Sequence, residues 1–115
     1  MNKRNIILIG MPGAGKSSVG VILAKVLGYE FIDTDLVIQH REKRLLREII
    51  ADEGNEGFLA IENEVNATLE ADKSVIAPGG SAIYGKEAME HFKEIGTIVY
   101  LKLSYEDLAK RLGNL

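Results

Sequence analysis

Eight residues near the N-terminus have the types and the spacing needed to hold phosphate groups. The segment Gly10-Met11-Pro12-Gly13-Ala14-Gly15-Lys16-Ser17 fits the phosphate-binding pattern G-x-x-x-x-G-K-S/T. Glycines let such a loop turn its backbone N–H groups inward, while the lysine reaches the β- and γ-phosphates and the hydroxyl reaches a magnesium ion. We therefore expect a nucleotide to be held by Gly10, Pro12, Gly13, Ala14, Gly15, Lys16, Ser17 and Ser18, with Ser17 also a ligand of Mg²⁺.

Two acidic residues supply a second requirement of phosphoryl transfer, an acid near the metal and the acceptor. Asp33 and Asp35 flank Thr34 just after a short predicted strand. In an extended segment, residues i and i+2 point the same way, so both carboxylates are expected to face one crevice. Asp33 is then a candidate metal ligand, and Asp35 a candidate for accepting or orienting the proton of an attacking hydroxyl. Alternatively, one of them caps the next helix, which does not exclude binding.

A second glycine-rich loop follows another predicted strand. Its sequence is Pro78-Gly79-Gly80-Ser81. Two glycines after a strand allow a ligand to approach the backbone closely, so this loop is expected to close the site. The alternative for this loop is a plain turn.

The elements that must position these loops alternate between strands and helices. Strands are predicted at 5–9, 30–32, 74–77 and 97–103. Helices are predicted at 18–27, 36–41, 45–51, 58–71, 86–94 and 105–112, the first with an apolar stripe at Val19, Ile22, Leu23, Val26 and Leu27. This alternation predicts an α/β fold with a parallel sheet covered by helices on both faces. Because loops after parallel strands share one edge, the three polar segments should converge there.

Composition sets limits on the class of protein. A chain of 115 residues with 46% hydrophobic and 27% charged residues is typical of one globular domain. The chain has no cysteine, which excludes disulfides and thiolate metal sites. A net charge of −3 without a basic stripe argues against a nucleic-acid partner. The sequence shows neither a signal peptide nor an apolar run of membrane-spanning length, so a cytoplasmic location is expected.

Taken in order, these motifs resemble the shikimate kinase family. The resemblance rests on the phosphate-binding loop, Phe31-Ile32-Asp33-Thr34-Asp35, Gly57-Phe58-x-x-x-Glu62 and Ala77-Pro78-Gly79-Gly80. It implies a three-layer P-loop kinase fold of the nucleoside-monophosphate-kinase type with a five-stranded parallel sheet. It also implies that MgATP phosphorylates the 3-hydroxyl of shikimate.

The same resemblance implies roles for individual residues. Asp33 would lie in the water shell of the metal, and Asp35 would contact the shikimate hydroxyls and serve as the base. Gly79 and Gly80 would line the substrate pocket.

The chain departs from the family pattern in three places. The family has an arginine that grips the shikimate carboxylate where this chain has Leu59, and leucine cannot form a charge-assisted hydrogen bond. Ser81 stands in place of a third glycine. The family also continues with a lid and a fifth strand. We therefore expect residues 1–115 to be the N-terminal portion of a single P-loop kinase core, with the C-terminal strand and the lid missing.

Three functions are compatible with this pattern. The first is phosphorylation of shikimate with ATP and Mg²⁺. The second is phosphorylation of another polyol such as gluconate, which Leu59 favours. The third is a non-catalytic nucleotide-binding module. For the kinase we expect a small-molecule substrate, no nucleic-acid or membrane partner, and a monomer at full length.

Overall fold

The core of the protein is a four-stranded parallel sheet. The structure is a computed structural model that describes residues 4–10 and 15–101. Its strands, in the spatial order β2-β3-β1-β4, are β1 (Asn5–Gly10), β2 (Glu30–Asp33), β3 (Ser74–Ala77) and β4 (Gly96–Leu101). The predicted parallel sheet is thus confirmed. The last two residues of the strand predicted at 97–103, and the helix predicted at 105–112, lie outside the described residues.

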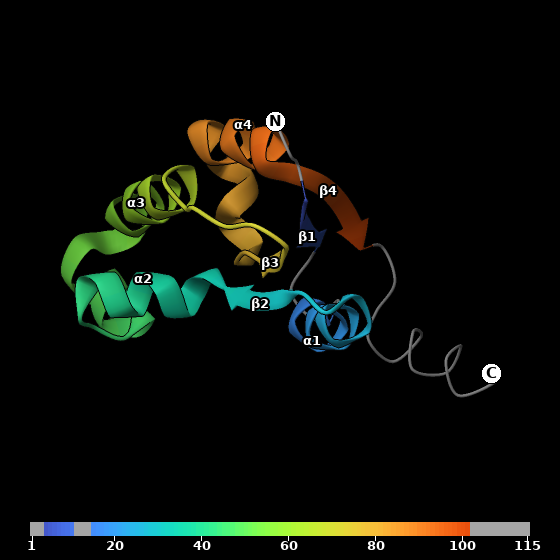
Figure 1. Cartoon of the computed structure of the whole chain (residues 1–115). Helices are drawn as coiled ribbons and strands as arrows, with labels where there is room; N and C mark the ends of the chain where they lie inside the picture. Colours follow the sequence, from blue (N-terminus) through green and yellow to red (C-terminus); the bar gives the residue numbers. More distant parts are fainter. Residues whose placement is uncertain (1–3, 11–14, 102–115) are drawn as a thin grey trace.

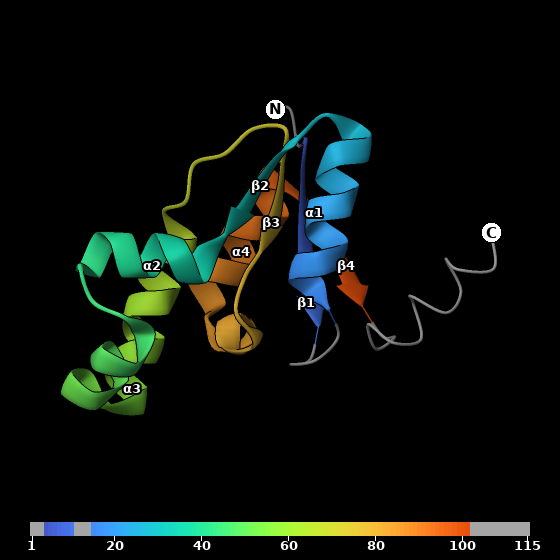
Figure 2. The same cartoon turned by 90° about the horizontal axis from the view of Figure 1, so that it is seen from below.

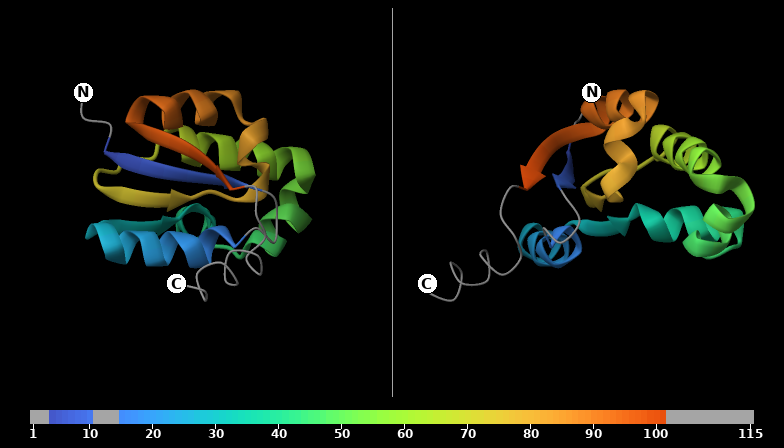
Figure 3. Two further views of the ribbon diagram at one scale, coloured as in Figure 1. Left: turned by 90° about the vertical axis from the view of Figure 1, so that its right-hand side faces the viewer. Right: turned by 180° about the vertical axis from the view of Figure 1, so that it is seen from behind.

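Helices cover both faces of this sheet (Figures 1 and 3). The helix α1 (Lys16–Leu27) lies on one face, and α4 (Lys86–Ile95) lies on the other. Side chains along β1 alternate between them, because Ile7 and Ile9 pack on the side of α4 while Leu8 packs on the side of α1. A central strand that is buried on both faces must be apolar throughout, which explains the unbroken apolar run in this segment.

Two further helices form a lobe beside the sheet, on the side away from α1 (Figure 2). They are α2 (Thr34–Glu42) and α3 (Leu46–Ala67), and they share an apolar cluster that includes Ile38 and Phe58. The two helices predicted within α3 are joined across a kink at Gly54, whose φ of 74° and ψ of 175° are not helical. No helix in residues 4–10 and 15–101 has the length and apolar character to cross a membrane.

The apolar stripe predicted for α1 is only partly right. Ile22 and Val26 belong to that stripe, yet they are 52% and 77% exposed. The helix instead approaches the sheet through its small residues Gly20 and Ala24, which are buried. A Cβ on Gly20 would lie 2.5 Å from the ring of Phe31, so this close contact requires glycine. Packing against an aromatic neighbour therefore rotates the helix away from its most apolar side.

The buried side chain of Asn5, at the start of β1, forms hydrogen bonds to three other segments of the chain. The Asn5 amide nitrogen donates to the carbonyl oxygens of Ala71, at 2.8 Å, and of Ile95, at 2.9 Å. Its oxygen accepts from the backbone N–H of Ser74 at 3.0 Å. Asn5 is 2% exposed, so these groups have little access to water. The side chain holds the start of β3 and the end of α4 against β1.

We predict that Asn5→Ala lowers the free energy of unfolding by about 2–4 kcal/mol, because buried polar groups lose their partners. Urea denaturation followed by circular dichroism measures the change. Asn55→Ala, at an exposed position of α3, is the matched control and should change stability by less than about 1 kcal/mol. Equal stability of the two variants would show that the hydrogen bonds of Asn5 do not contribute to the free energy of unfolding.

Candidate functional site

The first part of the site is the junction between β1 and α1. Gly15 begins α1 in the left-handed conformation, with φ of 78° and ψ of 30°. Among the described residues no side chain caps the helix, and no acidic residue lies in its first turn, so its N–H groups suit an anion. Lys16 Nζ donates to the carbonyl oxygen of Gly10 at 2.7 Å, which holds the ammonium group beside the end of β1. The predicted contacts at Pro12, Gly13 and Ala14 lie outside the described residues.

The described residues fit a nucleotide better than a free metal ion. The uncapped helix and Lys16 suit phosphate oxygens, and the side chains of Ser17 and Ser18 are exposed in the first turn of α1. Within residues 4–10 and 15–101, no three histidine, cysteine or carboxylate side chains come together as a metal site. Mg²⁺ bound here would take most of its ligands from phosphates and water, as this ion usually does.

The two predicted aspartates have different structural roles. Asp33 Oδ1 accepts from the backbone N–H of Asp35 at 3.0 Å, so Asp33 is the N-cap of α2. The capping alternative therefore holds for Asp33. The helix already begins at Thr34, so the expectation of an extended segment in which both carboxylates point the same way is wrong. Asp35 instead lies in the first turn of α2.

Three charges meet at Asp35, which is half-buried. Burial raises the pKa of this carboxyl group, and the negative charge of Asp33 raises the pKa further. The ammonium group of Lys16 acts in the opposite direction and lowers the pKa. The lysine of the phosphate loop is thus close enough to act on the acid, although 18 residues separate them in the sequence. A carboxylate with a raised pKa is a better proton acceptor than an ordinary aspartate.

The loop after β3 brings a second acid next to the first. A Cβ on Gly79 would lie 2.9 Å from Asp35 Oδ1 and 3.1 Å from Glu62 Oε2. Only glycine lets both acids approach the backbone so closely. The loop continues into a short 3-10 helix, η1 (Gly80–Tyr84), where only a loop was predicted. Ser81 Oγ lies on this helix and donates to Glu62 Oε1 at 2.7 Å.

Glu62 is absent from the predicted set of site residues. It is 2% exposed, and burial raises its pKa. The hydrogen bond from Ser81 lowers this pKa by less, and the charge of Asp35 raises it again. The signal in the sequence was an acid one helical turn after Phe58, on the apolar side of a predicted helix.

The remaining two predicted pocket residues lie in different environments. Leu59 is partly buried and packs against the apolar cluster that α2 and α3 share. Gly80 is exposed at the start of η1. The structure therefore brings Lys16, Asp35 and Gly79 together, whereas Leu59 contributes to the core of the lobe.

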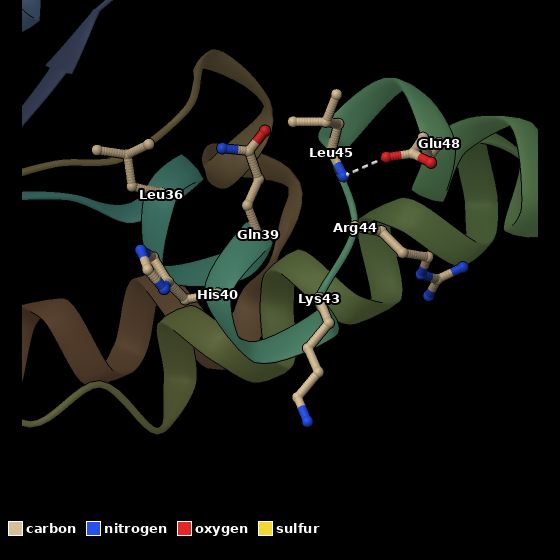
Figure 4. A pocket seen from close by; sticks show the side chains of 7 residues that line it. All are labelled: Leu36, Gln39, His40, Lys43, Arg44, Leu45 and Glu48. Atoms are coloured by element: carbon tan, nitrogen blue, oxygen red, sulfur yellow. Dashed lines mark hydrogen bonds between the residues drawn. The ribbon is translucent and has the colours of Figure 1, made fainter.

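A hollow of about 300 Å³ lies elsewhere, at the corner between α2 and α3 (Figure 4). Several of its polar groups bind within the protein: the Leu45 N–H donates to Glu48 Oε1 at 2.9 Å, and Arg44 forms ion pairs with three acids. The corner is thus held by its own contacts and contains no predicted site residue. The lining residues are Leu36, Gln39, His40, Lys43, Arg44, Leu45 and Glu48.

Comparison with known proteins places these features in a family. A model described as "Shikimate kinase" matches residues 12–115. The protein is similar to "Shikimate kinase 2" of Yersinia pseudotuberculosis, with 38% identity over 110 residues, covering 96% of this chain and 63% of that protein. The chain thus spans about 63% of the length of the curated relatives that it matches.

Solved structures agree with this result. A shikimate kinase from Acinetobacter baumannii in complex with shikimate is 36% identical, with a TM-score of 0.79, covering 94% of this chain and 61% of that one. Shikimate kinase from Bacteroides thetaiotaomicron is 32% identical, with a TM-score of 0.77, covering 96% of this chain and 64% of that one. The predicted three-layer P-loop kinase fold is therefore confirmed, and the chain belongs to the shikimate kinase family.

Proposed function

We propose that the protein transfers the γ-phosphoryl group of MgATP to a hydroxyl group of shikimate. One observation carries this proposal, the position of Asp35 beside Gly79 and within electrostatic reach of Lys16. An acid that faces a phosphate-binding lysine is the arrangement that transfer to an alcohol needs. Membership of the family supports the proposal, as does the shikimate bound to the Acinetobacter relative.

The nucleotide half of the site consists of α1 and the loop before it. Lys16 and the N-terminal N–H groups of α1 bind the phosphates, with the rest of the predicted loop around them. Ser17 would hold the metal through its hydroxyl group, and Asp33 would hold it through water with the carboxylate oxygen that does not form the cap. A bound Mg²⁺ supplies neutralisation of the negative charge on the transferred group.

The acceptor half of the site consists of the first turn of α2 and the loop after β3. Asp35 accepts the proton of the attacking hydroxyl at its carboxylate, and partial burial limits competition from water. The backbone of Gly79 and Gly80 contacts the acceptor. An acceptor that carries a carboxylate would also need a positively charged side chain beside that carboxylate, because an unpaired buried charge is costly.

Leu59 favours a second candidate, a kinase for a polyol without the carboxylate of shikimate. Leu59 packs against the apolar cluster of the lobe and carries no charge, so it cannot form an ion pair with the carboxylate of an acceptor. A non-catalytic nucleotide-binding module is the third candidate. For the kinase we further propose that residues 1–115 belong to one P-loop kinase core and that the full-length protein is a monomer. We also propose that it has no nucleic-acid or membrane partner and acts in the cytoplasm, where MgATP is available.

Release of ADP separates these candidates. The protein is supplied with MgATP and either shikimate or gluconate, and ADP is measured with a coupled assay. The proposal expects release that depends on shikimate. Release with gluconate alone would favour the second candidate, and nucleotide binding without transfer to any hydroxyl acceptor would favour the third.

We predict that Lys16→Ala weakens ATP binding by roughly tenfold to a hundredfold, because a charge-assisted contact to phosphate is lost. Isothermal titration calorimetry measures the dissociation constant. Lys25→Ala, on the exposed last turn of the same helix, is the matched control and should bind ATP as the wild type does. If both variants bind alike, Lys16 does not hold the phosphates.

We predict that Asp35→Asn reduces the rate of transfer by roughly a hundredfold to ten-thousandfold, because the amide cannot accept the proton of the hydroxyl. ATP affinity should remain within about twofold of the wild type, since this residue contacts no phosphate in the proposal. Asp72→Asn, at an exposed position before β3, controls for the change of charge. A fully active Asp35→Asn variant would leave this aspartate with a structural role only.

We predict that Gly79→Ala weakens binding of the acceptor by roughly tenfold or more, because the new methyl group displaces the carboxyl groups of Asp35 and Glu62. Both neighbours are flexible side-chain ends, so the fold should tolerate the change. Calorimetry with shikimate and with ATP compares the two halves of the site. Unchanged binding of shikimate would place the acceptor away from Gly79.

A further inference from the structure

The carboxyl group of Glu62 has one hydrogen-bond partner in the described part of the chain. Oε1 accepts from Ser81 Oγ at 2.7 Å, whereas Oε2 has no partner there. The residue is 2% exposed, so bulk water does not satisfy the second oxygen. Oε2 lies beside Gly79, as does Asp35 Oδ1. A buried acid is thus held at the wall of the proposed acceptor site by a single hydroxyl group.

The carboxyl group of Glu62 keeps this orientation only if a contact holds it in place. The terminal torsion of a glutamate is soft, so its carboxyl group turns easily. Asp35 raises the pKa of Glu62, which means that the two groups disfavour being charged together. Repulsion would turn the carboxyl group away from Gly79 if nothing held it. The 2.7 Å bond from Ser81 is a contact of the strength needed to oppose that rotation.

We infer that Ser81 is a positioning residue, whose hydroxyl fixes the Glu62 carboxyl beside Gly79 and Asp35 and so keeps the acceptor site in its binding shape. This inference rests on the proposed function. Position 59, one turn of α3 before Glu62, is a leucine that packs against the apolar cluster of the lobe. The serine hydroxyl provides a neutral partner for an acid beside an uncharged position 59.

A purely structural role for Ser81 makes a different prediction. If the hydroxyl served only to satisfy a buried acid, its loss would lower stability and leave the affinity of the folded protein for both ligands unchanged. A positioning role requires the two halves of the site to respond differently. The pKa of Glu62 rises under either role, because the hydrogen bond is lost in both, so it serves as the check that the bond has been removed.

We test this with Ser81→Ala, Ser81→Thr and the matched control Ser74→Ala. Ser74 is a buried serine at the start of β3, and its hydroxyl donates to the Asp72 carbonyl oxygen at 3.0 Å. Calorimetry measures the binding of shikimate and of ATP to each folded variant. NMR titration of the side-chain carboxyl carbon follows the pKa of Glu62.

For Ser81→Ala we expect shikimate affinity to fall roughly tenfold and ATP affinity to stay within about twofold. The pKa of Glu62 should rise, because the lost hydrogen bond favoured its ionised form. Ser81→Thr should restore both values, and Ser74→Ala should change neither. If Ser81→Ala does not fold, Ser81→Gly removes the same hydroxyl and should give the same two results.

An unchanged shikimate affinity in the folded Ser81→Ala or Ser81→Gly variant would overturn the inference, even if the pKa of Glu62 rises. Equal weakening of shikimate and ATP binding would also overturn it, since that indicates a general loss of structure. If the wild type binds ATP but not shikimate, the proposed acceptor is wrong. The same comparison is then made with gluconate, the second candidate acceptor, and equal affinities of the wild type and Ser81→Ala for gluconate overturn the inference.

Discussion

The parallel pairing of β3 between β1 and β2 is the constraint on which the site depends. The register aligns Ile7 with Ile76 and Asp33 with Ala77, so the three strands end at the same edge of the sheet. The described segments that follow each carry one part of the proposed site, namely the start of α1 with Lys16, the start of α2 and the glycine pair. Backbone hydrogen bonds between the strands are therefore enough to bring residues that are far apart in the sequence to the same edge.

This edge concentrates negative charge in a small space. Asp33, Asp35 and Glu62 come from three different elements, and Gly79 allows the last two to approach each other. Burial raises the pKa of Asp35 and of Glu62, and a neighbouring negative charge raises each pKa further. Lys16 opposes this effect at Asp35. An acid with a raised pKa close to a cation is suited to receive a hydroxyl proton.

The sequence was sufficient for the parallel sheet, the order of its elements and the convergence of the loops, because apolar runs and glycine motifs are local signals. It was not sufficient for features that depend on contacts between residues far apart in the sequence. Gly20 sets the face of α1 through contact with a ring from another element, and helix initiation at Thr34 makes Asp33 the cap. The pairing of Glu62 with Ser81 joins α3 to η1 across the fold, so no local pattern reveals it.

A crystal structure of the protein with ADP and shikimate tests the central claim most directly. The account predicts the β-phosphate of ADP at the N-terminus of α1, within reach of Lys16. It also predicts a shikimate hydroxyl about 2.6–3.2 Å from the carboxylate of Asp35. A structure with the phosphate bound elsewhere, or with every hydroxyl of shikimate remote from Asp35, would contradict it.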